Sequence, residues 1–209
     1  MKCARISKNS VLLTAILLAG IDTSLAARAA DAPKPPLPPG FSTSLQGGQH
    51  DFDYLVGAWT TQQKRLKAVA VGSNEWAEAP ANGHCAMSFL SGQTIVEQSQ
   101  SPNKGPAGLF IYNFSPTKQQ WAIRWVNGKT GELEPPYVGG FRGGRGEFYG
   151  DDDYDGRPIK VRIIWTNPDR DHARWEQSFS FDDRTWEVNW ISDFTRGDPA
   201  VICPKMVAR

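Results

Sequence analysis

The sequence predicts an all-β fold of about eight to ten short antiparallel strands. Apolar and polar residues alternate along several segments, as in Phe110, Tyr112 and Phe114, which is the period of a strand with one buried face. No long stretch of the folded part has the 3.6-residue period of a helix. All 8 tryptophans, and every phenylalanine except Phe41, lie in 49–203. Strands of this kind, without helices to cover them, pack as a sandwich or close into a barrel.

The first 29 residues have the three parts of a secretory signal peptide. Lys2, Arg5 and Lys8 give a positively charged start, 11–21 is an apolar stretch, and 27–29 (ARA) is a small-x-small cleavage site. The apolar stretch is shorter than the roughly 20 residues of a membrane-spanning helix, although an uncleaved anchor is the alternative. We therefore expect export to the bacterial periplasm or the medium, and a protein that is not integral to a membrane after signal cleavage.

Three further segments follow the signal peptide. Residues 30–48 contain the run PKPPLPP and end in two glycines, which predicts an extended linker that cannot pack a core. Residues 49–203 form one predicted domain, because the segment has the length of a single domain and shows no internal repeat. Residues 204–209 are a short C-terminal tail.

The charge balance excludes one class of partner. The chain has 23 Lys and Arg and 22 Asp and Glu, a formal net charge of +1. The first 29 residues hold four bases and one acid, so their removal leaves 19 bases and 21 acids and a net charge of −2. This balance gives no long-range attraction for phosphates, and we expect no nucleic-acid partner.

Two cysteines remain after signal cleavage, Cys85 and Cys203, because Cys3 leaves with the signal peptide. An even pair in an oxidising compartment predicts a disulfide, which would tie the C-terminal end of the domain to an early strand. Two unpaired thiols are the alternative, since the sequence does not fix the distance between the two Cα atoms.

The segment 174–193 has the pattern of a β-hairpin around the turn Asp182-Asp183-Arg184-Thr185. The predicted register pairs Arg174 with Asp193 on the polar face. On the apolar face it pairs Gln177 with Trp190 and Phe179 with Val188. Trp186 is expected on this same apolar face.

The aromatic side chains of the predicted strands are the most informative candidates for a site. Many tryptophans share the apolar faces of their strands, together with a few polar residues. An apolar cavity with a few inward polar groups is typical of a small-molecule site, although plain core packing explains many of these residues. The candidate ligand-binding residues are Trp121, Trp125, Trp165, Trp175, Gln177, Trp190 and Ser192.

The segment Leu55-x-Gly57-x-Trp59 resembles the Gly-x-Trp opening of lipocalins and the wider calycin barrels. This resemblance implies that Trp59 plugs one end of a barrel and that an arginine near the end of the last strand stacks over it. Arg196 is the candidate, and such a cation–π pair contributes about 0.5–2 kcal/mol. Gly57, Trp59 and Arg196 are therefore expected to be structural.

Further segments extend the resemblance over most of the folded part. They include Leu133-Glu134-Pro135-Pro136, Gly146-x-Phe148-Tyr149-Gly150 and Thr185-Trp186-Glu187-x-Asn189-Trp190. They are similar to an uncharacterised bacterial lipocalin-like family of unknown function. The resemblance implies a single antiparallel up-and-down β-barrel and no particular reaction. The nitrobindin-like haem barrels have further glycines where this chain has 60–62 (TTQ), so we expect no haem.

No metal or cofactor site is predicted from the ligand-type residues. His50, His84 and His172 are far apart in the sequence and are expected at the surface or in turns. The segment 151–156 (DDDYDG) fits the front half of a calcium loop. Its twelfth position is Arg162, where a bidentate glutamate is needed, so a solvated turn is expected.

Catalytic patterns are weak in this sequence. No Gly-x-Ser-x-Gly motif occurs, and His84 and Cys85 point to opposite faces of a strand, which excludes a dyad between them. Glu97, Glu134 and Glu176 lie in or beside predicted strands and leave carboxylate acid/base chemistry open. The hairpin register places Glu176 on the polar face with Arg174.

Three functions are compatible with these observations. We expect binding rather than catalysis, with a small hydrophobic or aromatic compound as the ligand inside the barrel. The first alternative is an enzyme that uses acid/base chemistry at the barrel mouth on a carbohydrate or phenolic compound, which requires an acidic or basic side chain pointing inward. The second alternative is a structural or interaction protein with a solid barrel.

Overall fold

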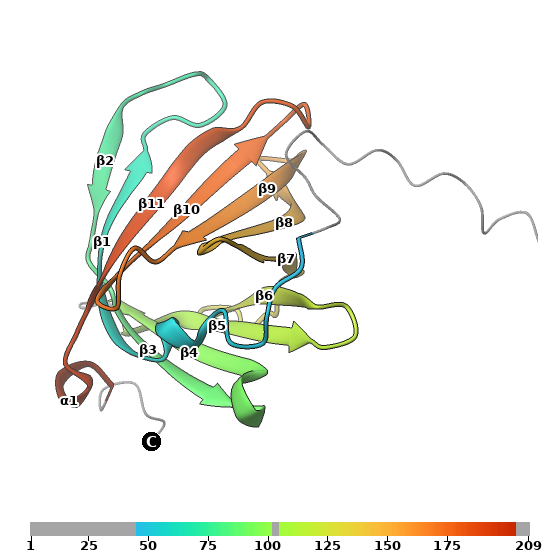
Figure 1. Ribbon diagram of the computed structural model, residues 1–209. Coiled ribbons are helices and arrows are strands. Elements are labelled where there is room, and N and C mark those ends of the chain that lie inside the picture. Colours follow the sequence, from blue (N-terminus) through green and yellow to red (C-terminus); the bar gives the residue numbers. More distant parts are fainter. Residues whose placement is uncertain (1–44, 102–104, 204–209) are drawn as a thin grey trace, which may run out of the picture. The chain divides into compact units, whose positions relative to one another are not determined.

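The computed structural model describes residues 45–101 and 105–203, and within them the chain forms one closed antiparallel β-barrel of ten strands (Figure 1). The predicted signal peptide, most of the predicted linker and the predicted tail lie outside the described residues. Helices are nearly absent from the described part, so the predicted all-β fold is confirmed. Over the same residues, no helix has the length and apolar character needed to cross a membrane.

Each barrel strand pairs with the next one along the chain, and β11 pairs with β1 to close the barrel. The strands are β1 (Gly57–Leu66), β3 (Gly83–Phe89), β4 (Thr94–Ser101), β5 (Gly105–Ser115), β6 (Gln120–Asn127), β7 (Tyr137–Arg142), β8 (Arg145–Tyr154), β9 (Arg157–Thr166), β10 (His172–Ser180) and β11 (Glu187–Arg196). The short strand β2 (Trp76–Ala79) pairs with the end of β1, beyond the reach of β3. Closure leaves no free edge around the barrel itself.

The β10–β11 hairpin follows the predicted register only in part. Arg174 pairs with Asp193 and Gln177 with Trp190, as predicted. The register then shifts, so that Val188 pairs with Ser178 instead of Phe179. One extra residue on β11 accounts for this shift and forms a β-bulge.

The bulge also places Trp186 on the opposite face from the predicted one, so the prediction that it shares the apolar face of Trp190 is wrong. Its ring centroid lies 5.8 Å from that of Tyr149, and the Arg162 guanidinium lies over the indole. Tyr149 and Arg162 alternate with the core residues Phe148 and Ile163, and therefore face outward. Trp186 thus packs on the outer wall of the barrel and does not share a face with Trp190.

The segment that precedes β1 closes one end of the barrel. A 3-10 helix, Asp53–Leu55, follows Phe52, and both Phe52 and Leu55 are completely buried. The Phe52 ring contacts the inward-facing rings of five barrel residues, with centroids 4.8–6.1 Å away: Tyr112, Trp121, Phe141, Phe148 and Trp165. This segment therefore belongs to the core (Figure 1, blue).

The last residues of the predicted linker also pack on the barrel. Leu45 is buried, the Gly47 N–H donates to the carbonyl of Gln119 at 2.8 Å, and Trp121 Nε1 donates to the carbonyl of Gly48 at 3.0 Å. Residues 45–48 thus extend the plug of the closed end instead of acting as a spacer.

Arg196 joins three segments at this closed end. Its guanidinium lies 3.7 Å from the Trp59 ring centroid and donates to the carbonyls of Tyr54 and Val56, each at 2.8 Å, and of Arg170 at 3.0 Å. Gly57 has a φ of 118°, and a Cβ there would lie 3.1 Å from Arg196 Nη1. Glycine therefore provides both the backbone conformation and the space that the guanidinium needs.

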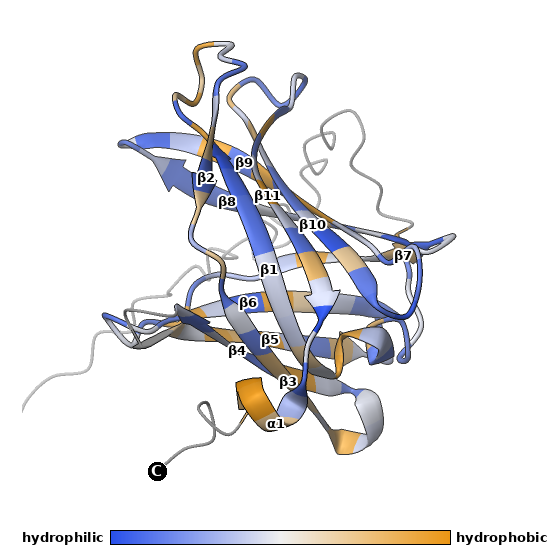
Figure 2. Ribbon diagram, turned by 90° about the vertical axis from the view of Figure 1, so that its left-hand side faces the viewer, coloured by the Kyte–Doolittle hydropathy of each residue, from blue (hydrophilic) through white to orange (hydrophobic). Residues whose placement is uncertain are grey.

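The predicted disulfide is present. Cys85 of β3 is bonded to Cys203, which follows α1 (Pro199–Ile202), and the two Cα atoms are 5.3 Å apart. The short helix α1 contacts β1 and β3 near the end of the barrel where β1 begins (Figure 2). Cys85 faces outward toward α1, whereas the neighbouring His84 faces the barrel interior.

We expect Arg196→Met to lower the free energy of unfolding by about 2–3 kcal/mol, because it removes the cation–π contact and leaves three carbonyls without their donor. Arg174→Met is the matched control, since Arg174 forms ion pairs on the outer wall with Glu176 and Asp193 and should cost at most about 1 kcal/mol. Urea unfolding followed by tryptophan fluorescence measures both. Equal losses in the two variants would contradict the role of Arg196.

Candidate functional site

The barrel interior has a closed half and an open half. Strand alternation directs Trp121 and Trp165 inward, and both are completely buried near the plug, with at most 2% of their surface exposed. Trp125, Trp175 and Trp190 also face inward, nearer the other end, but they are only half-buried. We call this end the open half, because these side chains of the inner wall keep accessible surface there.

A pair of tryptophans forms the inner wall of β10 and β11 in the open half. The rings of Trp175 and Trp190 meet edge to face, with centroids 5.1 Å apart. Trp190 Nε1 donates to Gln63 Oε1 at 3.1 Å, and the Arg65 guanidinium lies 3.5 Å from the Trp190 ring centroid. Gln177 is the strand partner of Trp190. Aromatic faces and polar side chains thus meet on one wall.

The structure brings together only some of the seven predicted ligand-binding residues. Trp175, Gln177, Trp190 and Ser192 are neighbours on β10 and β11, where Ser192 is buried and pairs with Trp175. Trp125 lies on another part of the inner wall, beside Phe110, with ring centroids 4.5 Å apart.

The other two predicted residues belong to the packed core of the closed half. Trp121 contacts Phe52 and Phe114, and Trp165 contacts Phe52, Tyr54 and Phe194. The sequence does not separate the two groups, because depth along the barrel depends on the pairing of the strands.

Arg65 was not among the predicted site residues, although it continues the inward alternation of Thr61 and Gln63 on β1. Arg65 is exposed overall, but its guanidinium is partly covered, and this desolvation lowers its pKa. None of the ion pairs among the described residues involves Arg65. The guanidinium is therefore held mainly by the face of Trp190.

A hydrogen-bonded polar group lies deeper in the barrel. His84 Nδ1 is 2.5 Å from Glu97 Oε1, and the Tyr112 hydroxyl donates to Glu97 Oε2 at 2.7 Å. Glu97 is completely buried, and His84 is 5% exposed. The expectation of a surface or turn histidine is thus wrong for His84. Its alternation with Ala86 on β3, and that of Glu97 with Ile95 on β4, is the signal that could have placed both side chains inside.

Among the residues that the structure describes, three buried polar atoms of the interior have no hydrogen-bond partner: Tyr54 Oη, His84 Nε2 and Trp165 Nε1. Burial raises the pKa of Tyr54 and of Tyr112 well above the ordinary value, and the negative charge of Glu97 adds to both shifts. Both hydroxyls therefore stay protonated over the physiological pH range. Buried polar groups without a partner are rare in folded proteins.

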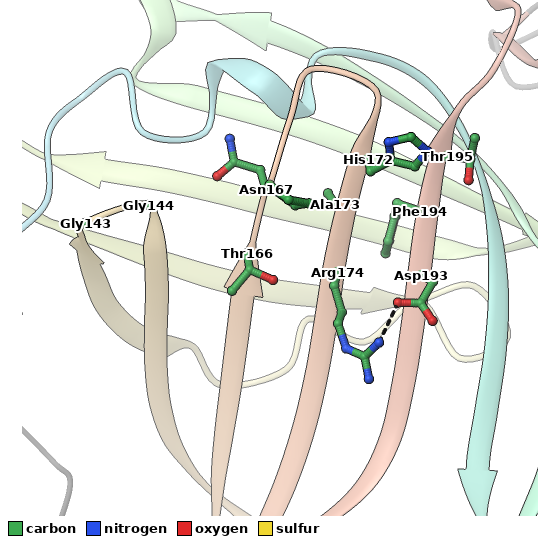
Figure 3. A pocket seen from close by; sticks show the side chains of 11 residues that line it. Gly143, Gly144, Thr166, Asn167, His172, Ala173, Arg174, Asp193, Phe194 and Thr195 are labelled. Carbon is green, nitrogen blue, oxygen red and sulfur yellow. Dashed lines mark hydrogen bonds and ion pairs between the residues drawn. The ribbon is translucent and has the colours of Figure 1, made fainter.

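Two hollows lie near the ends of the barrel. A groove of about 570 Å³ lies between the β7–β8 turn, the β9–β10 loop and the end of β11 (Figure 3). Its charged side chains and its histidine already have partners, since Arg174 is 2.9 Å from Asp193 and His172 is 2.9 Å from Asp169. The second hollow, about 330 Å³, lies at the open end and includes Phe179, Phe181 and Arg157 in its lining.

The remaining carboxylates do not gather into a metal site. Within 45–101 and 105–203, no three His, Cys, Asp or Glu side chains are placed to hold one ion. Asp151, Asp152 and Asp153 are exposed and form the end of β8, and Asp151 pairs with Lys160. Glu176 lies on the outer wall, where it accepts a hydrogen bond from Arg174 at 2.7 Å.

The fold and the interior define a closed ten-stranded β-barrel with a buried aromatic cluster. No protein-family model matches the chain, and a search of curated proteins finds no match. The lipocalin-like family therefore remains a prediction from sequence resemblance, and the functional argument rests on the interior itself.

The buried tyrosines predict a loss of stability at alkaline pH. A tyrosine whose pKa is raised in the folded state stabilises the fold below the unfolded pKa of about 10, and this contribution is lost as the pH rises above it. The free energy of unfolding should fall above pH 10 by up to about 1.4 kcal/mol per pH unit for each such group. Tyr54→Phe should make the fall less steep, and urea unfolding between pH 8 and 11.5 measures both slopes. Parallel slopes would contradict the burial of the Tyr54 hydroxyl.

Proposed function

We propose that the protein binds a small hydrophobic or aromatic ligand in the open half of the barrel. The observation that carries this proposal is the inward-facing, half-buried pair Trp175 and Trp190, with Gln63, Arg65 and Gln177 beside it. Small-molecule sites are concave and mostly apolar, with a few convergent polar groups that orient the ligand. The inner wall of β1, β10 and β11 has this composition.

The exposure of these side chains argues against a solid barrel. A barrel filled by its own side chains would bury the inward-facing tryptophans at every depth, as it does for Trp121 and Trp165. Trp125, Trp175 and Trp190 instead keep accessible surface on the inner wall. A ligand that covers apolar surface stabilises the complex by about 25 cal/mol for each Å² that it removes from water.

The proposal extends to the compartment in which the protein works. The Cys85–Cys203 disulfide supports a location outside the cytoplasm, because such bonds persist in oxidising environments. This agrees with the signal-like pattern of the first 29 residues. A soluble ligand of the periplasm or the medium is therefore the expected partner.

Acid/base catalysis is the second candidate function, and one observation favours it. Glu97 and His84 point inward and are hydrogen-bonded to each other, as required of an enzyme that acts inside the barrel. A carbohydrate or phenolic compound would be the substrate class. Chemical change of a bound compound in the presence of the wild-type protein, absent with Glu97→Gln, separates this candidate from simple binding.

Titration with N-phenyl-1-naphthylamine, a neutral aromatic probe, tests the proposed binding function. We expect saturable one-to-one binding with energy transfer from tryptophan, and about tenfold weaker binding by Trp190→Ala, because the variant loses one aromatic face of the site. Trp76→Ala is the matched control, since Trp76 lies on β2 beside the outward Lys64 and should bind the probe like the wild type. Absence of saturable binding by the folded wild-type protein would contradict the proposal.

A further inference from the structure

The guanidinium of Arg65 is a cation without an anionic partner. Within 45–101 and 105–203, it takes part in no ion pair and no hydrogen bond. Desolvation lowers the pKa of Arg65, and no carboxylate shifts this pKa in the opposite direction. The guanidinium has thus lost part of its hydration without gaining a counter-ion.

The stacking of Arg65 on Trp190 leaves its N–H groups free to bind. Its central carbon lies 3.5 Å from the centroid of the Trp190 ring, which is van der Waals distance. A guanidinium that stood on edge at this distance would press its nitrogen atoms into the ring, so the group lies nearly flat on the indole. Its N–H bonds lie in its own plane and therefore point past the ring.

Hydrogen bonds fix the indole beneath the guanidinium. Trp190 Nε1 donates to Gln63 Oε1, and Gln63 Nε2 donates to Thr61 Oγ1, each at 3.1 Å. Gln63 and Thr61 are buried, and the Trp175 ring meets the Trp190 ring edge to face. The guanidinium and the two aromatic rings are thus held in a defined arrangement before a ligand binds.

These three side chains can be reached from solution. Arg65 is exposed, and Trp175 and Trp190 are half-buried. The hollow of about 330 Å³ at the open end adjoins them, because it is lined by Phe179. Phe179 is the next inward residue of β10 after Gln177, which is the strand partner of Trp190. A ligand can therefore lie on this wall without displacing the packed core.

The carboxylates of this hollow do not neutralise Arg65. Glu187, at the start of β11, accepts the N–H groups of Ala70 at 2.7 Å and of Gly72 at 3.3 Å. Asp182 accepts two backbone N–H groups of its own turn. Both carboxylates thus hold loops of the open end, and the guanidinium of Arg65 is left for an anion from outside the protein.

The geometry of the guanidinium suits a carboxylate. A planar guanidinium donates two parallel N–H bonds to the two oxygens of a carboxylate, which is a charge-assisted and bidentate contact. One arginine balances the single negative charge of a carboxylate, whereas a phosphate monoester carries up to two. An aromatic carboxylate is also planar and brings a flat ring to a wall made of aromatic faces.

We propose that the ligand of this barrel is an aromatic or hydrophobic carboxylate, whose two oxygens accept hydrogen bonds from Arg65 while its apolar body lies on Trp175 and Trp190. The inference rests on the proposed binding function and names the ligand class within it.

Equilibrium dialysis at neutral pH with 2-naphthoate and 2-naphthamide tests this inference, because the two compounds have the same shape and only the first is an anion. We expect the wild-type protein to bind 2-naphthoate about tenfold more tightly. Arg65→Met should bind the two compounds equally, with little change for 2-naphthamide. Arg65→Lys should keep only part of the preference, since an ammonium group lacks the planar fork.

Lys64→Met is the matched control. It removes the same charge from the adjacent position of β1, but Lys64 lies over Trp76 on the outer face, so this variant should keep the full preference. Three results would overturn the inference: no preference for 2-naphthoate in the wild type, a preference that persists in Arg65→Met, or an equal loss in Lys64→Met and Arg65→Met. The proposed function stands in each case if N-phenyl-1-naphthylamine still binds one to one, and fails if it does not.

Discussion

The structure depends on the way Arg196 closes one end of the barrel. Its guanidinium stacks on Trp59 and donates to carbonyls of the plug and of the β9–β10 loop. One side chain at the end of the last strand thus holds the start of the first strand, the 3-10 helix that precedes it and a loop between two other strands. The pairing of β1 with β11, with Trp59 opposite Arg196, places these groups in register. Arg196 therefore links the closure of the barrel to the position of the plug.

The closed end gives the interior its two different halves. Near the plug, Phe52 fills the space between the inward rings, and the core is packed without accessible surface. At the opposite end nothing in the described residues fills the barrel in the same way, and Trp175 and Trp190 keep accessible surface. The buried His84–Glu97–Tyr112 group belongs to the closed half, because His84 is the strand partner of Trp59 and the Tyr112 ring lies 4.8 Å from that of Phe52. The two halves thus differ in packing, and the aromatic wall of the other half is the surface that the proposed ligand would cover.

The sequence predicted the fold class well because the strand signal is local. Period-two alternation marks each strand, and Arg174 opposite Asp193 follows from the turn between them. The prediction failed where pairing depends on a single residue, since the bulge near Asn189 moves Trp186 to the outer wall. It also missed His84, whose partner Glu97 is 13 residues away and reaches it only through the β3–β4 register. The seven candidate site residues share a face in the sequence pattern, but their depth in the barrel depends on strand pairing that the pattern does not contain.

The central claim is a barrel with a closed, packed half and an open, aromatic half, and hydroxyl-radical footprinting of the individual tryptophans tests it most directly. Mass spectrometry after brief radical exposure reports the accessibility of each indole in the native protein. The account predicts oxidation of Trp175 and Trp190 and protection of Trp59, Trp121 and Trp165, in line with their burial. Equal protection of all five would contradict it and indicate a barrel filled along its whole length.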